Sequence, residues 1–148
     1  MRNRITLFLV VLTISLVSCN DECNEGEKAT PASFFVEIID ETSGENVFEN
    51  ETYTSQQIVI QDLDEVAIPY EFVESSNIIQ IFPSVVNPTG NSFVIKLNNE
   101  TTLQMDEIDV TYDVSSSVGE CFTRFKIENI LFPNNTSELV EAVHVVKI

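Results

Sequence analysis

Strict alternation of apolar and polar residues is the dominant pattern in the second half of the chain. In the segment EIDVTYDV, residues 107–114, the apolar positions are Ile108, Val110, Tyr112 and Val114. The positions between them are polar, and two of them are Asp109 and Asp113. Successive side chains of a β-strand point to opposite faces, so this period of two predicts a strand with one buried and one solvated face. SFVIKL, residues 92–97, alternates in the same way.

Shorter apolar runs predict further strands. We expect them at residues 33–39 (SFFVEII), 56–61 (QQIVIQ), 66–72 (VAIPYEF), 77–82 (NIIQIF), 121–130 (CFTRFKIENI) and 139–148 (LVEAVHVVKI). Val66, Ile68, Tyr70 and Phe72 share a face of the 66–72 segment. Pro69 lies on the other face and lacks the N–H that a central strand donates, so this segment is predicted to be an edge strand. In the 121–130 segment, Cys121, Phe125 and Ile127 share the face predicted to point inward.

Polar turn segments such as DETSGEN, NPTGN and PNNTS separate these strands, and no amphipathic helix interrupts them. Residues 31–148 therefore indicate one all-β domain, a single antiparallel β-sandwich with an immunoglobulin-like or transthyretin-like outline. The chain contains no tryptophan, so it lacks the buried tryptophan of antibody domains.

The first residues follow a different pattern. Arg2 and Arg4 precede an uncharged, mostly apolar run from Ile5 to Val17. This run has the length of the hydrophobic region of a signal peptide and is shorter than the roughly 20 residues that a membrane-spanning helix needs. A buried core helix is the alternative, but such a helix would carry a polar face, and only a few hydroxyl side chains interrupt this run.

The run ends in Leu16-Val17-Ser18-Cys19, which resembles the lipobox of bacterial lipoproteins. Val17 departs from the Ala, Ser or Thr that is commonest at its position. The resemblance implies that residues 1–18 are a cleaved signal peptide and that the Cys19 thiol carries a diacylglyceryl group. It also implies acylation of the new amino terminus, and two or more acyl chains anchor a protein stably.

The charge of the remaining chain excludes one class of partner. The whole sequence has a net charge of −17, and without Arg2 and Arg4 it keeps five cations against 24 acids, a net charge of −19. Such a surface repels phosphates and anionic lipid headgroups, so we expect no nucleic-acid binding and a membrane attachment that depends on the lipid.

Residues 19–30 are predicted to form a flexible acidic tether, because charged segments of this kind seldom order. Asp21, Glu22, Glu25 and Glu27 also resemble the surface-export signals of Bacteroidota lipoproteins, and the whole chain resembles the small uncharacterised lipoproteins of that group. This resemblance implies an outer-membrane location, on the cell surface or, as the alternative, facing the periplasm. Asn20 is not the aspartate associated with inner-membrane retention in enterobacteria.

Lipidation of Cys19 would leave two cysteines, Cys23 and Cys121. In an oxidising compartment they are expected to form a disulfide, which would close a loop of about 100 residues. A redox or metal site is the weaker alternative, because the chain has no CxxC motif and its single histidine lies far along the sequence.

Candidate catalytic chemistry is sparse. His144 is the only imidazole and lies between two valines, outside any nucleophile motif, so we expect a structural histidine rather than a catalytic triad. Paired carboxylates of the kind that glycosidases use are abundant, but 24 acids produce such pairs by chance. The sequence thus favours a non-catalytic protein, with a hydrolase using paired acids as the least favoured class.

Calcium is the best cofactor candidate, because it prefers hard oxygen ligands. The two candidate groups are Asp62, Asp64 and Glu65 in one segment, and Asp106, Glu107 and Asp109 in another. Neither has the glycine and terminal glutamate of an EF-hand, and Asp109 with Asp113 is more simply explained as a solvated strand face. We therefore expect no cofactor, with these two groups as the candidates if calcium binds.

Two functions remain besides the hydrolase. The first is a binding or accessory module that presents an acidic β-surface to an envelope protein, a glycan or a cation. The second is a structural or assembly lipoprotein of an envelope complex. A concave loop surface with converging acids or tyrosines would favour the first, and an exposed apolar or edge-strand patch would favour the second.

Overall fold

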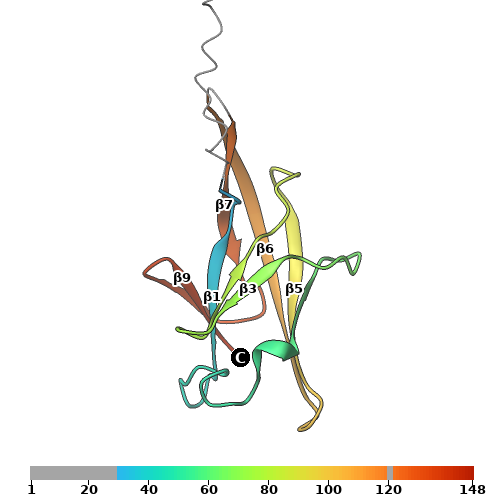
Figure 1. Ribbon diagram of the computed structural model, residues 1–148, viewed down its shortest axis with the longest axis vertical. Coiled ribbons are helices and arrows are strands. Elements are labelled where there is room, and N and C mark those ends of the chain that lie inside the picture. The colour runs from blue at the N-terminus through green and yellow to red at the C-terminus, as the bar shows by residue number, and fades with distance from the viewer. Residues whose placement is uncertain (1–29, 120–121) are drawn as a thin grey trace, which may run out of the picture.

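The computed structural model describes residues 30–119 and 122–148, and the predicted signal peptide, most of the tether and all three cysteines lie outside these ranges. The described strands form two sheets (Figure 1). The five-stranded sheet has the order β3 (Tyr70–Val73), β4 (Ile78–Ile81), β1 (Phe34–Ile39), β9 (Val143–Lys147) and β8 (Ser137–Val140). The four-stranded sheet has the order β2 (Ile58–Gln61), β5 (Asn91–Asn99), β6 (Gln104–Val118) and β7 (Thr123–Leu131). A single 3-10 turn, Ser55–Gln57, precedes β2.

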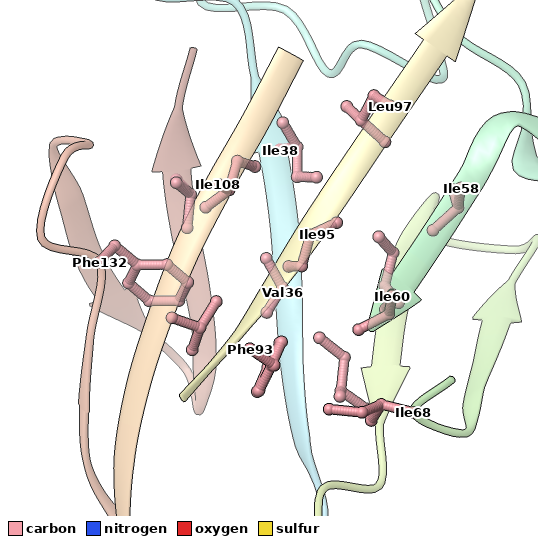
Figure 2. Close-up of a cluster of buried hydrophobic side chains, with 14 of the residues drawn as sticks. Val36, Ile38, Ile58, Ile60, Ile68, Phe93, Ile95, Leu97, Ile108 and Phe132 are labelled. Atoms are coloured by element: carbon pink, nitrogen blue, oxygen red, sulfur yellow. The ribbon is translucent and has the colours of Figure 1, made fainter. Parts of the chain in front are cut away.

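The inner faces of the two sheets pack against each other and form one hydrophobic core (Figure 2). Burial alternates along β1, β5 and the middle of β6, as a strand with one solvated face requires. The fully buried side chains of the core include Val36, Ile38, Ile95, Leu97, Ile108 and Val110. This packing confirms the predicted β-sandwich.

Two features of the five-stranded sheet differ from the expectation. β1 and β9 pair in parallel, with Phe35 opposite Val143, so the sandwich is not antiparallel throughout. The segment 139–148 is not one strand, because β8 and β9 form an antiparallel hairpin. Glu141 and Ala142 connect them with φ of 48° and 72°, and positive φ at both central residues is the conformation of a tight hairpin turn.

The segment 66–72 is strand only from Tyr70 onward, and it continues to Val73. β3 is an edge strand, as the proline predicts. Val66 does not share the buried face, because it lies in the preceding loop with 59% of its surface exposed.

The end of the β6–β7 hairpin extends beyond the rest of the sandwich (Figure 1). β5 pairs with β6 only as far as Tyr112, and the continuation of β6 pairs with β7 alone. We call this ribbon, residues 113–118 and 123–128, the arm. A register shift between Thr111 and Asp113 marks its base. Alternation predicts an inward-pointing Phe125, but Phe125 is 41% exposed because it lies on the arm rather than between the sheets.

Candidate functional site

An open cleft of about 600 Å³ lies at the end of the sandwich from which the arm projects. Its walls are the β2–β3 loop, the β4–β5 loop, and the last β5–β6 pair before the arm, Asn91 and Tyr112. The volume falls within the range typical of small-ligand sites.

Asp62 shapes the β2–β3 loop. Its Oδ1 accepts hydrogen bonds from the backbone N–H groups of Asp64 and Val66, both at 2.9 Å. The backbone N–H of Asp62 donates to the Val66 carbonyl at 3.0 Å, and Glu65 adopts a left-handed φ of 62°. These bonds fold the loop back on itself and place Asp62 and Asp64 on the wall of the cleft.

Tyr112 is the most deeply placed polar group of the cleft, with only 4% of its surface exposed. Its hydroxyl donates to the Ser84 carbonyl at 2.9 Å. Burial, reinforced by the negative charge of Asp62, raises the pKa of Tyr112 above that of a free tyrosine, so the phenol stays protonated at neutral pH. Asn91 donates to the Asn87 carbonyl at 2.9 Å and holds the β4–β5 loop against the sheet.

The remaining lining is largely apolar. Ile68, Pro69, Phe82 and Pro83 line the cleft, and two further apolar side chains that line it are open to solvent. These are Leu63, which is 77% exposed, and Val66. Apolar walls with a few fixed polar groups are the usual composition of a ligand-binding site.

The Asp62 and Asp64 carboxylates of this cleft can accept hydrogen bonds or attract a cation, and the Tyr112 hydroxyl already donates to a backbone carbonyl. A second hollow of about 440 Å³ is lined by Gln56, Gln57, Val59, Asn98, Glu100 and Thr101. It contains a single carboxylate, whereas hydrolysis by paired acids requires two.

His144 is not among the residues that line either hollow. Its ring packs between Phe34 and Phe132, with ring centroids 5.8 and 5.6 Å away. Burial lowers the pKa of His144, so the imidazole is neutral at pH 7. It has the surroundings of a core side chain.

The structure places the two candidate calcium groups differently. Asp62 and Asp64 reach the cleft together, but Glu65 does not line it. In the second group, Asp106 accepts a hydrogen bond from the Tyr53 hydroxyl, whereas Glu107 pairs with Lys96 at 3.4 Å on the other face of β6. Asp109 accepts a hydrogen bond from Asn134. Across residues 30–119 and 122–148, no three His, Cys, Asp or Glu side chains are grouped to hold a metal.

Sequence reasoning did not find this cleft. It identified Asp62 and Asp64 as ligand candidates and Tyr112 as a core residue, but gave no role to Ser84, Asn87 or Asn91. The sequence did contain one signal for the cleft, which is the turn composition of the β4–β5 loop. Prolines and the segment NPTGN mark an ordered loop there.

Comparison with known protein families, with curated proteins and with solved structures finds no match for this chain. In the described ranges, no helix has the length and apolar character to cross a membrane.

Proposed function

We propose that this chain is a lipid-anchored protein of the bacterial cell envelope that acts as a non-catalytic binding or accessory module. The observation that carries this proposal is the cleft, in which Asp62, Asp64 and Tyr112 converge among apolar side chains. A concave loop surface of this kind is what a binding module requires.

Anchoring through Cys19 is supported by the LVSC motif after an apolar run. β1 starts at the same end of the domain as the cleft, so an anchor at Cys19 would attach the domain at that end. Phe34 packs on Phe93 with ring centroids 6.2 Å apart, and Phe93 packs on Tyr112 at 5.8 Å. The proposed location is the outer membrane, with the domain on the cell surface. A domain that faces the periplasm is the alternative.

The chemistry of the cleft restricts the ligand. Carboxylates at the wall repel phosphates and accept hydrogen bonds, so a nucleic acid is disfavoured. A protein segment that carries a cation next to an apolar side chain would satisfy Asp64 and the exposed Leu63 together. A glycan would use the same carboxylates as acceptors for its hydroxyl groups.

A structural or assembly role is supported by a different surface. β7 and β8 are edge strands of their respective sheets. Leu131, Leu139 and Val140 are 61%, 64% and 47% exposed there. Exposed edges recruit further strands, so this side of the sandwich suits a permanent neighbour in an envelope complex.

An NMR titration of the ¹⁵N-labelled chain tests the binding role. The probes are calcium chloride, chitotriose and the pentapeptide acetyl-Gly-Leu-Lys-Leu-Gly-amide. We expect at least one probe to shift the amides of residues 62–69 and 84–92. The affinity obtained from these shifts should be at least tenfold weaker in Asp64→Asn. The asparagine side chain leaves the hydrogen bonds of the loop intact. Glu74→Gln makes the same charge change outside the cleft and should bind normally. Shifts that are equal in both variants would refute a role for this cleft.

Location is tested separately, by protease treatment of intact cells and labelled palmitate. We expect the palmitate label to disappear in Cys19→Ala, and the domain of the native chain to be released from whole cells. Labelling that survives Cys19→Ala would refute the anchor. Release only after the outer membrane is opened would favour the periplasm-facing alternative.

A further inference from the structure

We propose that the arm is a docking surface for the acidic segment of this same chain, residues 20–29, which would lie along the free edge of β7. The proposal is independent of lipid anchoring and of any ligand in the cleft. It concerns how the domain holds the segment that precedes it.

The arm is a two-stranded ribbon. Val114 and Ile127 at its base pack against the core, and beyond them no third strand of the described ranges pairs with it. A two-stranded hairpin is marginally stable in water by itself. Along residues 113–118 of β6 the only neighbouring strand in the described ranges is β7, and β7 has no neighbour on its other side there. The outer edge of β7 therefore presents backbone N–H and C=O groups that another extended segment can pair with.

The described chain begins at the end of the sandwich from which the arm projects. Residues 30–33 lead into β1, whose first residue, Phe34, packs its ring on Phe93, and Phe93 packs on Tyr112. Tyr112 is also the last β6 residue paired with β5, which is the point where the arm begins. The acidic segment therefore joins the described chain at the end of the sandwich that carries the surface we propose it occupies.

The lengths are compatible. Six residues on each strand make the arm roughly 20 Å long at about 3.3 Å per residue. Ten residues, from 20 to 29, span up to about 33 Å when extended. Four more residues, 30–33, link this segment to β1.

Charge favours the acidic segment, residues 20–29, as the occupant of the β7 edge. Of the described side chains, 19 are Asp or Glu and only four are Lys or Arg, and two of those four cations, Arg124 and Lys126, lie on the arm. Lys126 already pairs with Glu128 at 2.9 Å. Arg124 lies over the ring of Phe122 at 5.3 Å and has no carboxylate within 4.0 Å in the described ranges. The arm also carries Asp113 and Glu128, so its described charges cancel, and Arg124 is the cation left to pair with the four tethered acids. The tether keeps the effective concentration of those acids high at the arm.

Hydrogen exchange of the arm tests the proposal. The chain is purified in detergent with its native amino terminus, and every variant carries Cys23→Ser and Cys121→Ser, so that no disulfide holds the segment in place. The test variant neutralises the segment with Asp21→Asn, Glu22→Gln, Glu25→Gln and Glu27→Gln. The matched control removes the same charge at the other end of the sandwich, with Glu41→Gln, Glu45→Gln, Glu49→Gln and Glu100→Gln.

We expect the amides of residues 115–118 and 123–128 to exchange about three- to tenfold faster in the test variant, the effect of losing one or two exposed ion pairs. They should be unchanged in the control. A charge swap, in which Arg124→Glu and Lys126→Glu are combined with lysines at positions 21, 22, 25 and 27, should restore slow exchange. Amides of β5 report whether the sandwich itself stays folded.

Two results would overturn the proposal. One is equal arm exchange in the test variant and the unmodified background. The other is arm protection that falls when the protein is diluted twentyfold, because that would identify a second copy of the chain as the occupant.

Discussion

Raising the pH above 10 will destabilise this protein through its tyrosines, because folding holds each of them in its protonated form. Burial is the largest cause of the raised pKa of Tyr53, Tyr70 and Tyr112. Each hydroxyl also has an acceptor, which is the carboxylate of Asp106 for Tyr53 and a backbone carbonyl for the other two. Ionisation would bury a charge and break that hydrogen bond.

The sign follows from proton linkage. In the unfolded chain a tyrosine ionises near pH 10, whereas the folded chain keeps the proton to a higher pH. Above pH 10 the folded state therefore binds more protons, so the free energy of unfolding falls as pH rises. At pH 11 each tyrosine that stays protonated costs about 1.4 kcal/mol of stability. Tyr53, whose pKa burial and the Asp106 hydrogen bond raise strongly, therefore costs about 1.4 kcal/mol at pH 11, and Tyr112 adds to the loss in the same direction.

Urea unfolding followed by far-ultraviolet circular dichroism measures this loss between pH 8 and 11. Lysines titrate in the same range, so the double variant Tyr53→Phe/Tyr112→Phe serves as the reference. It will be less stable at pH 8, since two hydroxyl hydrogen bonds are lost, but its stability should fall less with pH, by about 1.4 kcal/mol or more at pH 11. A native chain that follows the same pH dependence as the reference would show that these tyrosines ionise normally in the folded state.

Three further outcomes follow from the structure. Burial lowers the pKa of His144, so its contribution to stability is present above pH 6.5 and is lost as the pH falls; His144→Leu should therefore make the decline in urea stability between pH 7 and pH 5 shallower. Ile95→Ala removes a fully buried side chain and should cost 2–5 kcal/mol in the same assay, whereas Val59→Ala, at a position that is 48% exposed, should cost less than about 1 kcal/mol. Asp62→Ala should speed hydrogen exchange at the Asp64 and Val66 amides about tenfold, while Asp62→Asn keeps an acceptor oxygen and should preserve most of their protection.

The alternation of apolar and polar residues predicted the inner faces of the strands well, because alternate side chains of a strand point to the same face of the sheet. Ile108, Val110 and Tyr112 are buried as the pattern requires. Edge position was also predictable for β3, since a proline restricts where a strand can lie.

The strand pairing and the cleft could not be predicted from local sequence patterns. Nothing in residues 34–39 specifies a parallel partner more than 100 residues away. The β8–β9 turn uses Glu141 and Ala142 rather than the Asn-Gly that usually marks such a hairpin, so a continuous apolar run concealed it. The cleft depends on two loops and a strand end that meet only after folding, and Tyr112 alternates like any other core residue.

The parallel pairing of β1 with β9 also determines when this domain can finish folding. β1 lies in the middle of its sheet, between β4 and β9, and Phe35 faces Val143, 108 residues later. Until residues 143–147 are free to pair, one side of β1 has no neighbour and the core is open there. Contacts of such long sequence separation form slowly, because the chain must close a large loop before it gains them. The sandwich can therefore close only after residues 143–147 have been synthesised and are free to pair.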